Sequence, residues 1–268
     1  MLIKAMKKII SLFLVFFGLT SFANAEKIDC IIVKQGDKTI IQEGKDCGTA
    51  YSPNSSFKIP LAVIGFESGI LKTAHNPIWK TQKPVTFLKY FHDGEQSPSS
   101  WMRWSMPWYS QILTQKMGMK KFQEYINRMN YGNMDLSGDA NKGNGLTDSW
   151  LSSSLKITPI QQVEFIEKLA KNALPFSKIS QIKAKDLLKL MEAGSWNGWT
   201  LHGKTGSSDF DKINVREGYF VGFAEKNGEI ISFVIHTSGD IGDKNAKTGG
   251  LQAKKILLDR MTKDGVFN

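Results

Sequence analysis

The stretch Ser55-Ser56-Phe57-Lys58-Ile59-Pro60 decides the fold, because a serine followed three residues later by a lysine opens an apolar segment. Residues three apart share one face of a helix, so the Lys58 amine can reach the Ser55 hydroxyl. A serine hydroxyl needs a base to act as a nucleophile, and a lysine is such a base only when burial or modification removes its proton. Ser55 is therefore a candidate nucleophile, at the positive end of a helix dipole.

A second motif, Lys204-Thr205-Gly206, ends a stretch that we expect to be a strand. A lysine and a threonine hydroxyl on a strand can bind a carboxylate, and Gly206 lets a substrate backbone approach closely. Neither motif is specific by itself. The two in this order resemble the motif set of the serine β-lactamases and penicillin-binding proteins.

The pattern around the motifs predicts strands at both ends of the chain and helices between them. The helix after residue 158 has the clearest start, because Thr158 and Gln161 form a capping box around Pro159. The expected elements are a hairpin of residues 31–33 and 39–42, helices at 56–71, 112–130, 159–172 and 253–261, and strands at 200–206, 219–224 and 230–236. This order implies an α/β sheet built from both ends, with an inserted helical region and a cleft between them.

The first residues predict export. A head with three lysines precedes an apolar run, Ile9–Phe22, which ends on Ala23-Asn24-Ala25. These features are typical of a cleaved signal peptide, so we expect residues 1–25 to be removed and the protein to be periplasmic. An uncleaved membrane anchor is the alternative. The rest, residues 26–268, is long enough for a single catalytic domain with a helical subdomain at about residues 72–195.

Charge and composition exclude several function classes. The formal net charge of +10 falls to +7 without the three lysines of the leader. A basic chain can bind nucleic acid or membranes, but these lysines are scattered and no arginine-rich run occurs. We expect no nucleic-acid partner and no membrane contact after cleavage of the leader. The positive field suits small anionic substrates.

Two cysteines, Cys30 and Cys47, flank the predicted hairpin. Export to an oxidising compartment favours a disulfide between them, and buried free thiols are the alternative. No metal site is expected, because the four histidines lack the spacing of metal ligands. They are His75, His92, His202 and His236.

Three further blocks narrow the resemblance: Trp104–Gln111, Tyr131-Gly132-Asn133 and Trp150–Thr158. With the two motifs above, the chain resembles the class D β-lactamases, the oxacillinase family. The resemblance covers almost all of the chain after the leader. It implies a mostly antiparallel sheet flanked by helices, with a mainly helical subdomain.

The resemblance also implies roles for single residues. Ser55 is the nucleophile, and Lys58, carbamylated by carbon dioxide, is the general base; no other cofactor is implied. Trp150 stabilises the carbamate and Ser105 relays protons. Lys204 and Thr205 hold the substrate carboxylate, and the backbone N–H groups of Ser55 and Ser207 form the oxyanion hole.

Two departures from the family pattern stand out. The second motif, usually S-x-V, is Ser105-Met106-Pro107 here, which alters the wall beside the modified lysine. The arginine that many members use as a further carboxylate anchor is absent, and Thr248 or Lys247 are its candidate replacements. The block Tyr131-Gly132-Asn133 could serve either the fold or the chemistry.

The sequence thus predicts hydrolysis of β-lactam antibiotics through a serine acyl-enzyme, giving resistance. The alternative is a penicillin-binding or β-lactam-sensing protein that is acylated but deacylates slowly. A noncatalytic envelope protein is a third reading, which requires the motifs to coincide by chance. The sequence does not choose between penicillins, cephalosporins and carbapenems, and it gives no oligomeric state.

Overall fold

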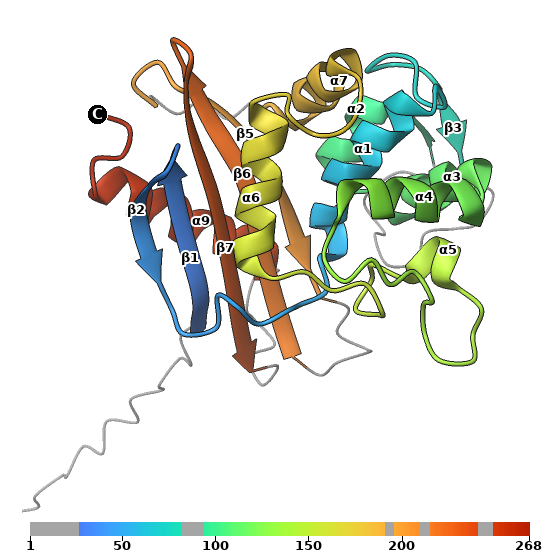
Figure 1. Ribbon diagram of the computed structural model, residues 1–268, viewed down its shortest axis with the longest axis horizontal. Coiled ribbons are helices and arrows are strands. Elements are labelled where there is room, and N and C mark those ends of the chain that lie inside the picture. The colour runs from blue at the N-terminus through green and yellow to red at the C-terminus, as the bar shows by residue number, and fades with distance from the viewer. Residues whose placement is uncertain (1–26, 82–93, 191–195, 209–214, 241–248) are drawn as a thin grey trace, which may run out of the picture.

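A five-stranded sheet is the centre of the molecule (Figure 1). The computed structural model describes residues 27–81, 94–190, 196–208, 215–240 and 249–268. Among them the sheet order is β2-β1-β7-β6-β5, and every neighbouring pair is antiparallel. The strands are β1 (Lys27–Gln35), β2 (Lys38–Glu43), β5 (Thr200–Ser207), β6 (Val215–Lys226) and β7 (Glu229–Asp240). The sheet is therefore built from both ends of the chain, as expected.

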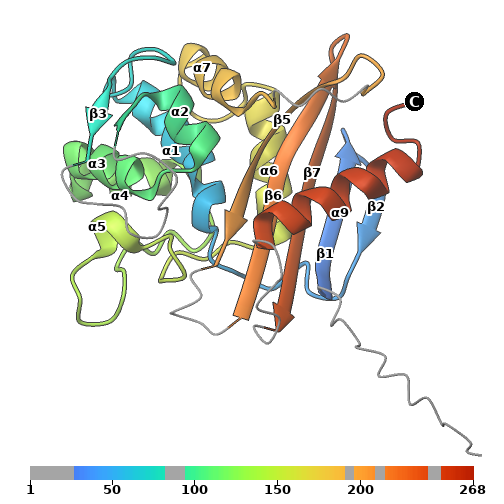
Figure 2. The ribbon, with the colours of Figure 1, turned by 180° about the vertical axis from the view of Figure 1, so that it is seen from behind.

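Helices cover both faces of this sheet. The last helix, α9 (Gly249–Lys263), lies across one face (Figure 2), and α6 (Pro159–Ala170) lies on the other (Figure 1). The remaining helical elements are the 3₁₀ turn η1 (Asn54–Phe57), α1 (Lys58–Glu67), α2 (Pro98–Trp104), α3 (Pro107–Met117), α4 (Met119–Met129), α5 (Gly145–Asp148) and α7 (Lys178–Leu188). A short ribbon of β3 (Trp79–Lys80) and β4 (Glu95–Gln96) lies beside them. None of the helices formed by the described residues has the length and apolar character needed to cross a membrane.

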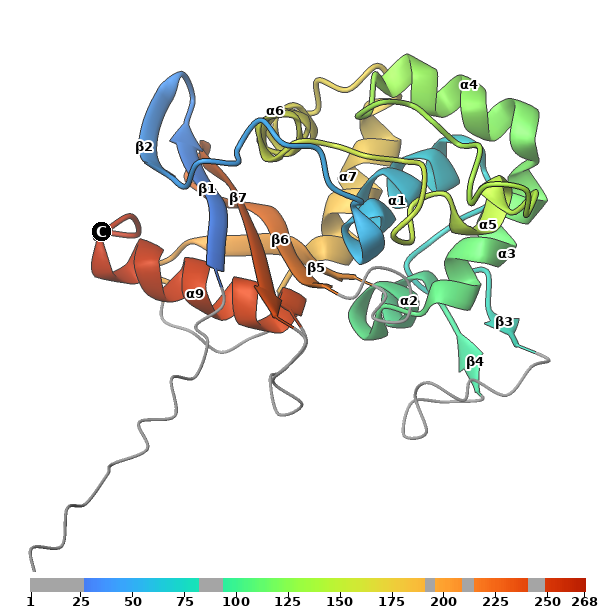
Figure 3. The same cartoon turned by 90° about the horizontal axis from the view of Figure 1, so that it is seen from below.

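Alternation along β6 explains the two hydrophobic layers. Tyr219, Val221 and Phe223 point into the core under α6, while Phe220 and Ala224 point into the core under α9. Side chains of a strand alternate between its faces, so a strand buried on both sides is apolar at nearly every position. The sheet is thereby fixed between two layers, and its edge strand β5 faces the helical part of the molecule (Figure 3).

The expected elements are present with two corrections. The helix expected at residues 56–71 is the end of the turn η1 followed by α1, which ends at Glu67. The helix expected at residues 112–130 is two helices, α3 and α4, which are separated at Gly118. Gly118 has a φ of 77°, a conformation that glycine adopts readily and that ends a helix. The capping box at Thr158 and Gln161 is confirmed, with both reciprocal hydrogen bonds formed. The helices α2 and α7 were not expected from the sequence.

The Cys30–Cys47 disulfide is confirmed. It joins β1 to the loop after β2, at the end of the sheet order that lies far from β5. The expected signal peptide, residues 1–25, lies outside the described residues.

Candidate active site

The turn that carries Ser55 is held in an uncommon conformation. Asn54, directly before it, has a φ of 49°, which is rare for residues other than glycine but accessible to asparagine. The Asn54 carboxamide oxygen accepts hydrogen bonds from the Ser152 backbone N–H at 3.0 Å and the Ser152 hydroxyl at 3.2 Å. The Asn54 N–H donates to the Trp150 carbonyl at 3.0 Å. The loop at 150–152 thus fixes one side of the nucleophile turn.

The Lys58 amine reaches the Ser55 hydroxyl, as the spacing predicted. Lys58 Nζ donates to Ser55 Oγ at 3.1 Å. Lys58 is 0% exposed, whereas Ser55 is only partly buried. Burial lowers the pKa of Lys58 well below its usual range, and the positive charge of Lys204 lowers it further. A neutral amine next to an accessible hydroxyl can accept the hydroxyl proton.

Lys204, on β5, is the second buried amine of the site. Burial and then the positive charge of Lys254 lower its pKa to about 7. Lys204 Nζ donates to the Thr205 carbonyl at 3.1 Å and to the Thr205 hydroxyl at 3.2 Å. The ammonium and hydroxyl groups expected to hold a carboxylate therefore lie together.

The end of β5 lies against the serine turn. A Cβ on Gly206 would lie 2.7 Å from the Pro53 carbonyl oxygen and 3.2 Å from the Ser56 nitrogen. These are backbone atoms that cannot easily move, so only glycine fits there. Ser207, the next residue, has its hydroxyl held by the Gly250 N–H at 3.0 Å. The close approach brings the Lys204-Thr205-Gly206 motif beside Ser55.

Trp150 packs against the turn that carries Ser55. Its ring is fully buried and stacks on Phe57, the neighbour of Lys58, with centroids 5.3 Å apart. Its indole Nε1 has no hydrogen-bond partner among the described residues. A buried N–H without a partner is costly and calls for an explanation. The unpartnered indole N–H of Trp150 and the lowered pKa of Lys58 both fit a carbamate on that lysine.

Ser105 lies in the short connection between α2 and α3. It is half-buried and has a φ of 59°, a strained value for a serine. Pro107 is the first residue of α3, a position that suits proline because its missing N–H is not needed there. Helix α3 contacts α1, which carries Lys58 at its start. Pro107 therefore serves the start of helix α3.

The block Tyr131-Gly132-Asn133 makes structural contacts. A Cβ on Gly132 would lie 2.0 Å from the Lys156 carbonyl oxygen. The Asn133 N–H donates to the same carbonyl at 2.9 Å, and the Asn133 carboxamide bonds Ser154 and Lys156. Tyr131 is buried, and its hydroxyl donates to Gln162 at 3.3 Å. Of the two interpretations, these contacts favour the one in which the block serves the fold.

Two residues expected at the site lie outside the described residues, and two residues that were not expected form or contact the serine turn. Thr248 and Lys247 lie outside the described residues. No group of three metal-binding side chains occurs in the described ranges, where His202 bonds Glu225 and His236 bonds Asp29. The sequence analysis missed Asn54 and Gln162, because no spacing rule links them to Ser55.

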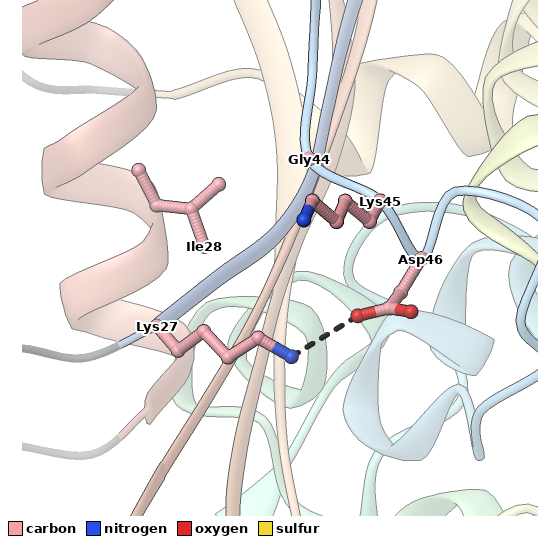
Figure 4. Close-up of a pocket in the computed structure, with 5 residues that line it drawn as sticks. All are labelled: Lys27, Ile28, Gly44, Lys45 and Asp46. Carbon is pink, nitrogen blue, oxygen red and sulfur yellow. Dashed lines mark hydrogen bonds and ion pairs between the residues drawn. The ribbon is translucent and has the colours of Figure 1, made fainter.

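A surface hollow lies away from these residues (Figure 4). It is lined by the start of β1 and the loop after β2, at Lys27, Ile28, Gly44, Lys45 and Asp46. Lys27 Nζ bonds Asp46 at 3.1 Å across it. An exposed ion pair of this kind contributes little, and the hollow contains none of the residues of the site.

Comparisons with known proteins agree on one family. The penicillin binding protein transpeptidase domain family matches residues 34–262. β-Lactamase OXA-9 of Klebsiella pneumoniae is 36% identical over 269 residues, which cover 94% of this chain and 96% of OXA-9. β-Lactamase OXA-1 of Escherichia coli is 34% identical over 79% of this chain and 75% of its own length. The crystal structure of the OXA-427 class D β-lactamase superimposes with a TM-score of 0.76 and 34% identity, over 88% of this chain and 99% of that one.

Proposed function

Since this chain belongs to the class D β-lactamase family, we propose that it hydrolyses β-lactam antibiotics through an acyl-enzyme on Ser55 and so confers resistance. The observation that carries the proposal is the 3.1 Å contact between Lys58 Nζ and Ser55 Oγ, with the lysine fully buried. A buried amine with a lowered pKa is the group that a serine nucleophile requires.

Acylation follows from the positions of these groups. Lys204 and Thr205 bind the carboxylate of the drug, which presents the lactam carbonyl to Ser55. The base at Lys58 takes the Ser55 proton while Oγ bonds the carbonyl carbon, and the lactam C–N bond then breaks. Ser105 passes a proton to the departing nitrogen. The backbone N–H groups of Ser55 and Ser207 stabilise the oxyanion, which the close approach of β5 to η1 supports.

After acylation, deacylation requires a base that activates the water which hydrolyses the acyl-enzyme. The residues around Lys58 fit a carbamate, which supplies an anionic carboxylate at the lysine when it is formed. Lys58 would hold it and Trp150 Nε1 would donate a hydrogen bond to it. The lowered pKa of Lys58 supports this proposal, because a protonated amine does not react with carbon dioxide. The full burial of Lys58 limits the access of competing water to its amine.

The remaining expectations from the sequence stay proposals. We propose export to the periplasm by cleavage of residues 1–25 and a single catalytic domain, residues 26–268, with the helical subdomain at about residues 72–195. Thr248 is proposed as a further carboxylate contact in place of the usual arginine. The partner is a small β-lactam, with no nucleic acid.

A chromogenic cephalosporin tests the function. Steady turnover supports hydrolysis, whereas a single stoichiometric burst supports the slow-deacylating alternative and no reaction supports a noncatalytic protein.

Ser55→Ala should abolish covalent capture of penicillin in mass spectrometry. Ser68→Ala, a half-buried serine at the end of α1, is the matched control and should be acylated normally. An adduct on Ser55→Ala would place the nucleophile elsewhere.

Carbon-13 NMR with labelled bicarbonate tests the carbamate independently of activity. The native protein should give one carbamate signal that Lys58→Ala lacks and that acid removes. Trp150→Phe should weaken the signal, because the indole N–H is lost. Trp199→Phe is the matched control, since Trp199 Nε1 is also buried without a partner among the described residues but lies in the core under α9. Full signal in Trp150→Phe would remove that tryptophan from the proposal.

A further inference from the structure

One buried glutamine on α6 joins the nucleophile turn to the rest of the helical part. Gln162 is 1% exposed, and its Nε2 donates to the Ser56 hydroxyl at 3.2 Å. Its Oε1 accepts from the Tyr131 hydroxyl at 3.3 Å. The Ser56 hydroxyl in turn donates to the Pro53 carbonyl at 2.7 Å. These bonds connect α6 and the segment after α4 to both sides of Ser55.

Hydrogen-bond counting fixes the direction of this network. A serine hydroxyl has one proton, and that of Ser56 is used on Pro53, so Ser56 must accept from its other partner. The amide nitrogen of Gln162 therefore faces Ser56, and its oxygen faces the tyrosine proton. In this arrangement Ser56, Gln162 and Tyr131 are each hydrogen-bonded within one buried network, and such a network holds its members in one conformation.

The same tyrosine also positions the next residue of the turn. The Tyr131 ring packs on Phe57 with centroids 5.5 Å apart. Ser56 and Phe57, the two residues between Ser55 and Lys58, are therefore both held from outside the turn. The position of Ser55 Oγ relative to Lys58 Nζ depends on the backbone of these two residues.

We propose that Gln162 is a positioning residue for acylation, which acts through the Ser56 hydroxyl to hold Ser55 Oγ against Lys58 Nζ. This inference rests on the proposed function. Among the described residues, the Gln162 side chain is hydrogen-bonded to Ser56 and Tyr131 and not to the nucleophile, so its effect is on the geometry of the attack. A misplacement of about 1 Å at a reacting atom can cost about 100-fold in rate.

Gln181 offers a matched control. It is fully buried on α7, and its amide is also saturated with hydrogen bonds. Its partners are backbone groups of Asn172, Leu174 and Phe176 in the loop before α7, so it supports a different part of the fold. Gln181→Leu and Gln162→Leu remove equivalent groups, and both should lower the melting temperature.

The test is single-turnover acylation by a chromogenic cephalosporin, with the active fraction taken from the burst amplitude. We expect Gln162→Leu to lower the acylation rate per active molecule by about 10- to 100-fold, with the dissociation constant of the drug within about two-fold. Gln181→Leu should keep the native rate per active molecule. An unchanged rate in Gln162→Leu, or an equal loss in Gln181→Leu, overturns the inference.

Two further variants make the test specific for the Ser56 contact. Ser56→Ala should reproduce most of the loss, and adding Gln162→Leu to it should cost little more, since both changes break one network. Additive losses overturn the inference. If Gln162→Leu does not fold, Gln162→Met replaces it: methionine fills a similar volume and has no donor for Ser56, and a native rate again overturns the inference. A native protein that is not acylated at all contradicts the proposed function itself, whereas normal acylation of both native protein and Gln162→Leu contradicts only this inference.

Discussion

Among single residues, two buried amines set the electrostatics of the site. Lys58 and Lys204 both have lowered pKa values, and burial is the main cause for each. Their tasks in the proposed mechanism differ, because Lys58 must be neutral to accept a proton and Lys204 must be charged to hold a carboxylate. That mechanism therefore requires a pH at which Lys58 is unprotonated and Lys204 is still protonated.

The charge of Lys204 predicts a pH limit on substrate binding. Its pKa of about 7 means that the cation is present below that pH and is lost as the pH rises through it. The dissociation constant of penicillin should therefore rise by up to about tenfold per pH unit above about pH 7. Single-turnover kinetics across about pH 6 to 9 measures it. Lys204→Arg, which stays charged, should remove this rise. A dissociation constant that stays constant in the native protein would contradict the role of Lys204.

Residue type and spacing were enough to predict the pair Ser55 and Lys58, but not its surroundings. Three residues along a helix is a local distance, so the contact follows from the sequence. Asn54 accepts a hydrogen bond from Ser152, a residue 98 positions away. Trp150 stacks on Phe57 only in the folded chain. Such contacts are set by tertiary packing, for which no local pattern exists.

At the scale of elements, the sequence predicted the sheet better than the helices. Strands β6 and β7 are joined by a turn at Asn227-Gly228, whose residues have φ values of 52° and 86°, and an Asn-Gly pair is a strong sequence signal for such a hairpin. The helices α3 and α4 were merged because hydrophobic periodicity continues across Gly118, and only the backbone conformation of that glycine separates them. Helix α2 was missed although Ser97 and Ser100 form a capping box, because serine at the third position is not the usual partner.

The contact between β5 and η1 predicts the effect of a single methyl group. Gly206→Ala would place a Cβ 2.7 Å from the Pro53 carbonyl, so β5 and the serine turn must separate. We expect the second-order rate constant for penicillin to fall by about 10- to 100-fold, because Lys204 and Ser207 move with the strand. Gly48→Ala is the control, since nothing lies within 4 Å of its Cβ. Steady-state kinetics on both variants measures this effect. If Gly206→Ala keeps the native rate constant, as Gly48→Ala should, the close approach has no catalytic role.

For the whole molecule, the disulfide stabilises a part of the sheet remote from the chemistry. Cys30 and Cys47 are 17 residues apart, and closing such a loop contributes about 3 kcal/mol in the chain-entropy model. Cys30→Ala with Cys47→Ala should lower the melting temperature by about 6–12 °C in a chain of this size. The turnover per folded molecule should stay native, because β1 and β5 are separated by two strands. Calorimetry and an assay at low temperature check both parts. A large loss of turnover per folded molecule would show that the two ends of the sheet are coupled.

Burial of the Lys58 amine should also lower the stability of the whole protein. In the unfolded chain Lys58 has an ordinary pKa of about 10.4 and is protonated at neutral pH. In the folded chain its pKa is well below that range, so the unfolded state binds more protons. Stability therefore rises with pH through this group, and the penalty is present at neutral pH and disappears as the pH approaches about 10.

Lys58→Met removes this penalty, because methionine fills the space of an unbranched chain without a group to desolvate. The variant should be inactive yet melt about 2 °C or more above the native protein at about pH 7, and this difference should shrink as the pH rises. The measurement is thermal unfolding in buffer free of carbon dioxide, so that the native amine stays unmodified. Lys156→Met is the control: Lys156 is only half-buried and donates to Ser52 at 2.8 Å, so its loss should not stabilise the fold. If Lys58→Met melts below the native protein at neutral pH, the lysine contributes to the fold and does not oppose it.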